Sequence, residues 1–313
     1  MNTMRAIRQD ALGGPEVLKE VRVERPSPRP NEVLVRVRAA GMNPTDWKHR
    51  ANGGFLGRPP FVLGWDVSGE VAEVGIGVAG FRPGDEVFGM LPYPFGHGSH
   101  AEYVTGPARA FTHKPAGVDH VQAGALPLVS LTAWQALVEV ADVRPGQRVL
   151  IHAGAGGVGH VAVQIAKVLG AHVIATASGA KHDFLRSIGV DEPLDYRETD
   201  FTEAVRDVDV VLDTIGAETS VRSLGVVRPG GTVVSILPVG PEDFPREAER
   251  LGVRAVRMLV DADRGGMLKV ARLVEDGRLR AEIAGTFPLG EAAEAHAVGE
   301  RGRTTGKLVL AVD

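Results

Sequence analysis

The 313-residue sequence contains no cysteine. That absence excludes disulfide bonds and thiolate catalysis, and it removes the softest of the protein ligands for zinc. Long apolar runs are also missing, because no stretch reaches the 18 or so residues that a membrane-spanning helix needs. The N-terminal MNTMRAIRQD lacks the apolar core of a secretory signal. We therefore expect a soluble, cytoplasmic protein without a membrane partner.

An excess of basic charge is lacking as well. The chain has 35 Lys and Arg against 39 Asp and Glu, a formal net charge of -4, which gives no reason to expect a nucleic-acid partner. Aromatic residues make up only 5% of the sequence, whereas glycine occurs 40 times. This composition favours an α/β protein packed with Ala, Val and Leu and rich in tight turns. The length allows two domains.

Short alternating segments dominate the first third of the chain. Examples are EVLVRVRAAGMNP, DVSGEVAEVGIGV and GDEVFGML, separated by Gly and Pro. Such segments predict a small, twisted β-barrel.

The pattern changes from Asp119, which we interpret as the N-cap of a helix. After Pro145-Gly146, apolar strands and amphipathic helices alternate, beginning with RVLIHA and GVGHVAVQIAKVLG. This alternation predicts a parallel sheet with right-handed crossover helices. The closing strand, GKLVLAVD, is placed back on the N-terminal barrel.

The sequence GAGGVG at residues 154–159 satisfies the pattern G-x-G-x-x-G. It follows a buried strand and opens an amphipathic helix, the context in which glycines let the backbone approach a pyrophosphate at a helix N-terminus. The alternative is an ordinary tight turn between a strand and a helix. The context favours dinucleotide binding.

The strand that follows this helix ends in Ala177-Ser178, where an acid would bind the ribose 2′-hydroxyl of NAD. Without that acid, nothing there repels a 2′-phosphate. Ser178 can donate a hydrogen bond, Lys181 adds a positive charge one turn later, and Tyr196 follows the next strand. We therefore predict NADPH as the cofactor. The alternative for Lys181 is a solvated charge at the start of a helix.

These features resemble the medium-chain dehydrogenase/reductase superfamily, and within it the zinc-free quinone oxidoreductase (zeta-crystallin-like) branch. The resemblance extends over nearly the full length, through segments such as AAGMNPTDWKHR, GWDVSGEVAEVG, GSHAEYV and LPLVSLTAWQAL. It implies a GroES-like barrel domain of residues 1–122 and 264–313 and a Rossmann domain of residues 123–263, with the active site between them. It also implies NADPH and a homodimer that pairs the edge strands of two Rossmann sheets. The segment GTVVSIL is our candidate for that edge.

This chain departs from the zinc-dependent members of the superfamily at their ligand positions. Asn43 stands where they have Cys, Trp65 stands where they have His, and the third position, near Leu128, is apolar. His97 and His100 form an H-x-x-H pair, which we interpret as loop histidines rather than a metal site. We predict no metal. Without a Lewis acid to stabilise an alkoxide, reduction of a quinone or a conjugated C=C bond is favoured over alcohol oxidation.

Two residues of the segment NPTDWKHR are candidates for binding the acceptor oxygen. They are Asn43 and Lys48, whose ammonium could neutralise a developing enolate or quinol anion. The alternative for Lys48 is a surface lysine, and Asp46 is expected to cap the short helix that starts there. Tyr93, Phe95 and Phe55 are candidates for lining the acceptor pocket, or for packing only.

The resemblance adds Thr132 and Lys307 as contacts of the nicotinamide ribose or phosphates, although Lys307 could instead be a solvated residue leading the last strand. The predicted function is NADPH-dependent, zinc-free reduction of a quinone or an α,β-unsaturated ketone or aldehyde. Alternatives are an enoyl-thioester reductase of the same fold and a non-catalytic NADPH-binding protein. The predicted cofactor-binding residues are Thr132, Gly154, Gly156, Gly157, Val158, Ser178, Lys181, Tyr196, Ile215, Ile236 and Lys307.

Overall fold

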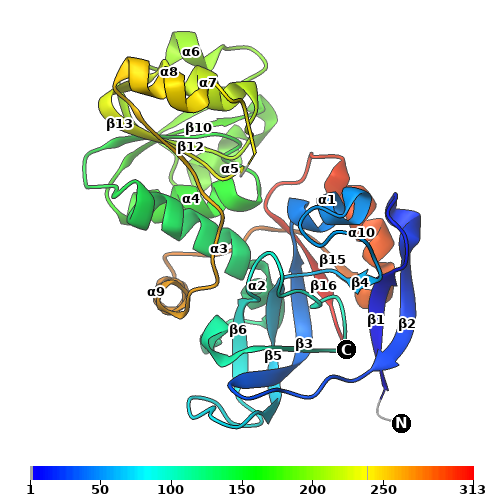
Figure 1. Ribbon diagram of the computed structural model, residues 1–313. Coiled ribbons are helices and arrows are strands. Elements are labelled where there is room, and N and C mark those ends of the chain that lie inside the picture. The colour runs from blue at the N-terminus through cyan, green and yellow to red at the C-terminus, as the bar shows by residue number, and fades with distance from the viewer. Residues whose placement is uncertain (1–2, 238) are drawn as a thin grey trace. The chain divides into compact units, whose positions relative to one another are not determined.

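The computed structural model describes residues 3–237 and 239–313 (Figure 1). The chain forms two compact units. The first unit runs to Leu131 and resumes at Asp261, and the second comprises Thr132–Val260. We expected the boundaries after residues 122 and 263.

The first boundary falls later than expected because helix α2 (His120–Ala125) packs on the barrel of the first unit. A Cβ on Gly124 would lie only 2.9 Å from the Cβ of Ala39, so the two backbones approach closely. Asp119 caps this helix as expected, because its carboxylate accepts a hydrogen bond from the backbone N–H of Gln122.

A seven-stranded, largely antiparallel sheet forms the barrel of the first unit, as the alternating segments predicted. Its strand order is β15-β16-β3-β5-β6-β8, and β7 pairs with β3, while a smaller sheet has the order β2-β1-β4. Val35 and Val37 of β3 are buried and alternate with the partly exposed Arg36 and Arg38. The strands are β1 (Thr3–Gln9), β2 (Leu18–Glu24), β3 (Glu32–Met42), β4 (Phe61–Val62), β5 (Asp66–Val74), β6 (Glu86–Met90), β7 (Tyr103–Pro107), β8 (Phe111–His113), β15 (Ile283–Pro288) and β16 (Lys307–Ala311).

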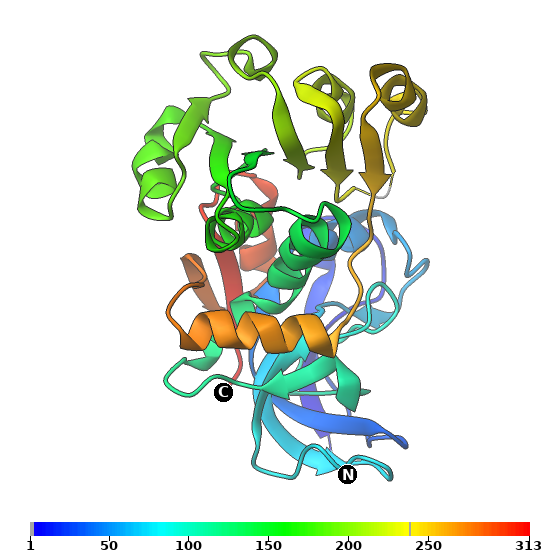
Figure 2. The ribbon, with the colours of Figure 1, turned by 90° about the vertical axis from the view of Figure 1, so that its left-hand side faces the viewer.

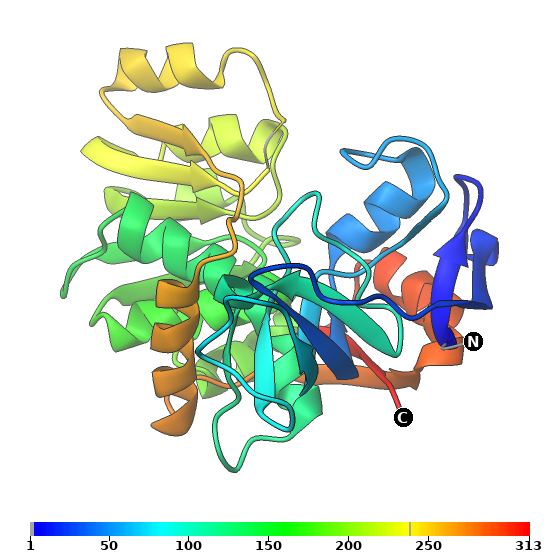
Figure 3. The same cartoon turned by 60° about the horizontal axis from the view of Figure 1, so that its bottom comes forward.

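The end of the chain returns to the barrel, as predicted. Strand β16 pairs antiparallel with β3, placing Leu310 opposite Ala40. Helix α10 (Ala292–Glu300) packs against α1 (Pro44–Asn52), which follows β3 directly (Figure 3). The other helical segments of this unit are α3 (Pro127–Trp134), which continues into the second unit, α9 (Arg264–Glu275), η1 (Pro15–Val17), η2 (Ala108–Ala110) and η5 (Leu289–Glu291).

The second unit is a doubly wound parallel sheet with the order β11-β10-β9-β12-β13-β14. In chain order this is 3-2-1-4-5-6, the dinucleotide-binding arrangement, and it confirms the predicted Rossmann fold. The strands are β9 (Arg148–Ile151), β10 (His172–Ala177), β11 (Glu192–Asp195), β12 (Val208–Asp213), β13 (Val227–Ser235) and β14 (Arg254–Arg257). The helical segments are η3 (Gln135–Val140), α4 (Gly157–Val168), η4 (Gly179–Lys181), α5 (His182–Ser187), α6 (Phe201–Ala204), α7 (Glu218–Leu224) and α8 (Phe244–Leu251).

Our prediction of the edge strand of this sheet is wrong. GTVVSIL belongs to β13, which pairs with β12 on one side and with β14 on the other (Figure 2). The segment VRAVRML supplies the outer strand, β14, which covers the edge that we had assigned to β13. The edges of the sheet are therefore β11 and β14. Among the described residues, no helix is long and apolar enough to cross a membrane.

Candidate active site

The turn between β9 and α4 packs its glycines closely against other segments of the same unit. A Cβ on Gly154 would lie 2.7 Å from the Cβ of Ala175, and a Cβ on Gly159 would lie 2.2 Å from the carbonyl oxygen of Ala153. No larger residue fits at either position unless its neighbours move. Gly156 is the N-cap residue of α4.

The left-handed residue of this turn is not one of its glycines. Ala153 has a φ of 49°. Strand β10 fixes the turn, because Gly154 donates to the carbonyl oxygen of Thr176 at 2.8 Å and Ala153 donates to its hydroxyl at 3.1 Å. The first N–H groups of α4 have no acceptors within the helix and carry partial positive charge, which suits a pyrophosphate.

Four further predicted cofactor residues lie at the same edge of the sheet. Ser178 and Tyr196 directly follow β10 and β11, while Ile215 and Ile236 follow β12 and β13 within two residues. Parallel strands end at one edge, so these residues share it with Gly157 and Val158, which open α4. Thr132 instead lies buried in α3. Direct contact of any of these residues with the cofactor stays a prediction.

Lys181 lies in the short turn that follows β10, next to other polar residues. It ends the 3-10 turn η4, and its backbone N–H donates to the carbonyl oxygen of Ser178 at 2.8 Å. The side chain is half-buried, which disfavours the alternative of a fully solvated charge. Burial lowers the pKa of Lys181, while Tyr196 raises it and Arg197 lowers it. The charge of Lys181 is thus influenced by Tyr196 and Arg197, the two residues that follow β11.

The sequence reasoning missed an acid at this position. The parallel register of β10 and β11 sets Asp195 opposite Ala177, and its carboxylate accepts hydrogen bonds from the N–H groups of Gly179 (2.6 Å) and Arg197 (2.9 Å). The bond from Arg197 is the largest cause of a lowered pKa of Asp195, and the bond from Gly179 adds to it, so the carboxylate is ionised at neutral pH. The signal was available, because Asp195 directly precedes Tyr196, which we had placed at the end of the next strand.

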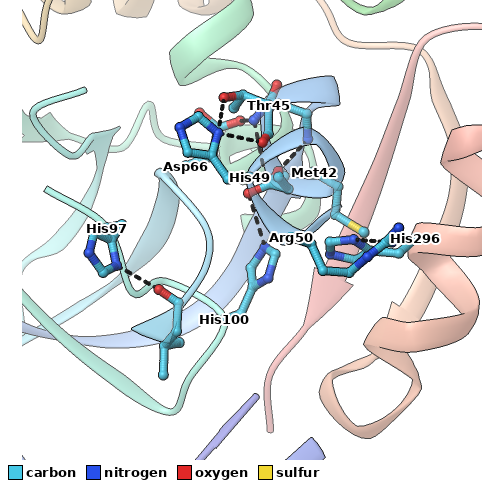
Figure 4. A network of polar contacts seen from close by, with 12 residues as sticks. Met42, Thr45, His49, Arg50, Asp66, His97, His100 and His296 are labelled. Atoms are coloured by element: carbon cyan, nitrogen blue, oxygen red, sulfur yellow. Dashed lines mark hydrogen bonds and ion pairs between the residues drawn. The ribbon is translucent and has the colours of Figure 1, made fainter. Parts of the chain in front are cut away.

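The first unit contains a buried polar cluster at the start of α1 (Figure 4). Asn43 donates from Nδ2 to Asp66 at 2.9 Å and accepts at Oδ1 from the Nζ of Lys307 at 2.5 Å. Lys307 also donates to the carbonyl oxygen of Met42 at 2.7 Å, and Asp66 accepts from the N–H of Leu128 at 2.6 Å. Both ends of the Asn43 amide are thus engaged inside the barrel unit. Its contact with an acceptor stays a prediction.

The environment of Lys307 excludes the interpretation of this residue as a solvated lysine. The residue is 2% exposed, so it is not a solvated lysine. Burial lowers the pKa of its ammonium, and the charges of Asp66 and Asp46 raise it. Its contact with the nicotinamide ribose or phosphates stays a prediction.

Helix α1 begins earlier than predicted, and its N-cap residue is Asn43 instead of Asp46. Asp46 keeps a structural role at the third position of the helix, where its carboxylate accepts a hydrogen bond from the backbone N–H of Asn43 at 2.6 Å. Lys48 is exposed on the same helix, one turn after Thr45. Whether Lys48 acts on an acceptor is untested.

The two histidines of the H-x-x-H pair have separate surroundings (Figure 4). The Nδ1 of His97 lies 2.6 Å from the carbonyl oxygen of Val62, whereas the Nε2 of the fully buried His100 lies 3.9 Å from the Oδ1 of Asp46. Trp65, at the position of a zinc-binding histidine in the resemblance, donates from its indole N–H to the carbonyl oxygen of Pro94. Within residues 3–237 and 239–313, no group of three His, Cys, Asp or Glu residues is placed to hold a metal ion.

A GroES-like barrel unit and a doubly wound parallel sheet with a glycine turn define a class, the nicotinamide-dependent dehydrogenases and reductases. Comparisons with known proteins agree with this class. Residues 29–116 match the model of the alcohol dehydrogenase GroES-like domain, and residues 188–310 match that of the zinc-binding dehydrogenase.

Three similar proteins cover most of the chain. The mitochondrial NAD(P)H oxidoreductase RTN4IP1 of Danio rerio is 32% identical, with 90% of this chain and 84% of the relative covered. The 2-haloacrylate reductase of Burkholderia sp is 36% identical, with 95% and 96% covered. The structure of the quinone oxidoreductase from Coxiella burnetii has a TM-score of 0.95 and 38% identity, with 99% of this chain and 100% of that chain covered.

The chain belongs to the medium-chain dehydrogenase/reductase superfamily, in its zinc-free quinone oxidoreductase branch. It is an oxidoreductase with a nicotinamide cofactor. The residues present fit such a group, because the second unit offers a turn without side chains, a helix N-terminus and polar residues at the strand ends.

Proposed function

We propose that the protein is an NADPH-dependent, zinc-free reductase of quinones or of α,β-unsaturated ketones and aldehydes. The observation that supports this proposal most directly is the set of residues at the carboxyl edge of the parallel sheet. The glycine turn and Lys181 lie there, and β10 ends there without an acid of its own. The names of two relatives, a quinone oxidoreductase and a 2-haloacrylate reductase, support this range of acceptors.

The second unit would bind the cofactor. The glycine turn and the first N–H groups of α4 receive the pyrophosphate, and Ser178, Lys181 and Tyr196 receive the 2′-phosphate. Arg197 adds a second cation beside this group. Asp195 is ionised nearby, but its carboxylate already accepts two backbone hydrogen bonds, which offset part of its repulsion.

Bound NADPH supplies a hydride from C4 of its nicotinamide. The chain's own contribution is to hold the acceptor and to stabilise the negative charge that develops on its oxygen. We assign this task to Lys48, whose exposed ammonium can approach that oxygen, with Asn43 as the second candidate. Ile215, Ile236, Thr132 and Lys307 complete the proposed cofactor contacts.

The test is NADPH oxidation by the purified protein with a panel of quinones, enones and enoyl thioesters. We expect turnover with quinones or enones, both before and after dialysis against a strong chelator. Preference for enoyl thioesters would instead identify the enoyl-thioester reductase. Tight binding of NADPH without turnover of any acceptor would identify a non-catalytic protein, and loss of activity with the chelator would contradict the metal-free mechanism.

We further propose a homodimer in the cytoplasm. The edge strand β14 replaces GTVVSIL as the candidate for its interface. One similar protein is named as mitochondrial, so the compartment needs its own test, for example fractionation of the source cells.

A further inference from the structure

A hydrogen-bonded chain of side chains connects α1 with the loop after β6. The hydroxyl of Tyr93 lies 3.0 Å from the Oγ1 of Thr45, and that Oγ1 lies 3.0 Å from the Nδ1 of His49. The same Nδ1 is 2.8 Å from the carbonyl oxygen of Thr45, and the Nε2 of His49 accepts from the backbone N–H of Phe55. Figure 4 shows Thr45 and His49 side by side.

These contacts fix the direction of the hydrogen bonds. Because the N–H of Phe55 donates to Nε2, that nitrogen carries no proton, and the proton of the neutral ring of His49 resides on Nδ1. Burial lowers the pKa of His49, which keeps the ring neutral at pH 7. A protonated Nδ1 cannot accept a bond from Thr45, so the Thr45 hydroxyl is left to donate to the oxygen of Tyr93.

The phenolic proton of Tyr93 is therefore available for another acceptor. Within the described part of the chain, the hydroxyl of Tyr93 has its hydrogen-bond partner in Thr45. Burial raises the pKa of Tyr93, so the phenol keeps its proton at neutral pH. The side chain is only partly buried, which leaves room for a ligand to reach it.

The surroundings of this hydroxyl are aromatic. The ring centroid of Tyr93 lies 5.3 Å from that of Trp65 and 6.2 Å from those of His49 and Phe55. Phe55 is 45% exposed and Phe95 is 74% exposed, so apolar rings near this position face outward. A planar, conjugated carbonyl compound is suited to such rings, since its flat face can pack on them.

We propose that Tyr93 is a catalytic residue whose phenolic hydroxyl donates a hydrogen bond to the carbonyl oxygen of a planar conjugated acceptor. This inference rests on the proposed function. When hydride adds to the β carbon of an enone, the π electrons move toward the carbonyl oxygen, which becomes an enolate oxygen. Tyr93 stabilises that charge, and water supplies the proton that completes the saturated ketone. Thr45 is a positioning residue, since it orients the phenol.

The test is Tyr93→Phe, which keeps the ring and its packing and removes only the hydroxyl. Loss of one such donor costs about 10²- to 10³-fold in kcat, and we expect at least a ten-fold decrease for enones. KM for NADPH should not change. Thr45→Val should lower kcat by a smaller factor, because the phenol remains but loses its orientation. The matched control is Tyr103→Phe, on strand β7, which should behave like the parent.

A second readout does not depend on turnover. Calorimetric titration with 4-nitrophenolate, whose oxygen mimics the enolate, should show about ten-fold weaker binding to Tyr93→Phe than to the parent or to Tyr103→Phe. Equal kcat in an active parent and Tyr93→Phe would overturn the role of Tyr93. If the parent reduces no acceptor, the proposed function fails. The titration then decides on Tyr93 alone, and equal binding by the parent and Tyr93→Phe overturns its assignment.

Discussion

Three lysines of the chain illustrate how strongly the local environment determines what a charge can do. Lys48 is exposed, Lys181 is half-buried, and Lys307 is 2% exposed with oxygen partners on three residues. Water competes least with a ligand where a charge is desolvated, so the effect of a contact increases with burial. Lys181 should therefore contribute more to ligand binding than Lys48, and the proposed cofactor contact of Lys307 would come from an ammonium that these three partners already hold in place.

The first prediction concerns Lys181 and the choice of cofactor. A hydrogen bond to a charged group contributes about 1.5–3 kcal/mol, which corresponds to roughly ten-fold to a hundred-fold in affinity. Lys181→Ala should weaken NADPH by this factor and leave NADH nearly unchanged, as measured by fluorescence titration with each cofactor. Lys269→Ala, an exposed lysine of α9, is the control. Equal losses for both cofactors would show that Lys181 does not contact the 2′-phosphate.

The second prediction concerns Lys48. If its ammonium stabilises charge only as hydride arrives, Lys48→Ala should lower kcat and kcat/KM together for enones. Because water can partly replace an exposed ammonium, we expect about ten-fold rather than the 10²- to 10³-fold of a buried donor. Quinones should be affected less, since they accept hydride with less help, and NADPH affinity should not change. Parent-like turnover of enones would make Lys48 a surface charge and leave Tyr93 as the donor.

At the scale of the elements, helix α1 is anchored by ionisable groups that are buried together. Its Asp46 lies 3.9 Å from His100, the ring of His100 lies 5.9 Å from that of His296 in α10, and His296 meets Arg50 of α1 at 3.2 Å. Arg50 pairs in turn with Glu300. Burial lowers the pKa of His100 to about 3 and lowers that of His296 as well, whereas burial raises the pKa of Asp46 to about 7.

These shifts give the third prediction, an acid-sensitive fold. Below pH 6.5 the unfolded chain takes up protons at His100 and His296 that the folded chain does not, so stability decreases as the pH falls from 6.5 toward 4. Asp46 has the opposite sign between pH 3.8 and about 7, because there the folded chain holds the extra proton. Asp66, whose pKa burial also raises, adds to the effect of Asp46. His152, whose pKa burial lowers to about 4, adds to the effect of His100 and His296, so the three histidines outweigh the two aspartates over most of this interval.

Urea unfolding measured from pH 6.5 to pH 4 tests this prediction. His100→Gln should reduce the slope of the unfolding free energy against pH by about 1.4 kcal/mol per pH unit, the contribution of one proton. His113→Gln, which alters an exposed histidine of β8, should leave the slope unchanged. An unaltered slope in His100→Gln would mean that His100 takes up a proton at the same pH in the folded and the unfolded chain.

Local patterns predicted the second unit better than the buried cluster of the first. The glycine turn is contiguous in sequence with the strand before it and the helix after it, so this local context indicated the dinucleotide-binding fold. The contact of Lys307 with Asn43 joins residues 264 positions apart and depends on the pairing of β16 with β3, which no local pattern reveals. Asp195 was missed for a related reason, because it reaches Gly179 through the register of two neighbouring strands.

At the scale of the whole molecule, the open edges of the parallel sheet determine how two copies could associate. GTVVSIL was the wrong candidate because strand order depends on which later segment pairs with it, and β14 fills that position. The other edge strand, β11, ends on Asp195, which lies beside the proposed cofactor site. Strand β14 lies at the opposite edge of the sheet from β11, so pairing there leaves the proposed cofactor site uncovered, and it is the edge better suited to pair with its copy across a two-fold axis.

The fourth prediction is that backbone pairing through β14 holds this dimer together. The N–H of Met258 donates to Ser235 of β13, so alternation along the strand directs the N–H groups of Ala255 and Arg257 to the open edge. Ala255→Pro removes one such donor while sparing the bonds to β13, and it should weaken the dimer at least ten-fold in sedimentation velocity. Ala255→Ser keeps the N–H and should remain dimeric. A monomeric parent would rule out β14 as the interface. A dimer of Ala255→Pro as tight as that of the parent would also rule it out, because proline lacks the N–H that edge pairing requires.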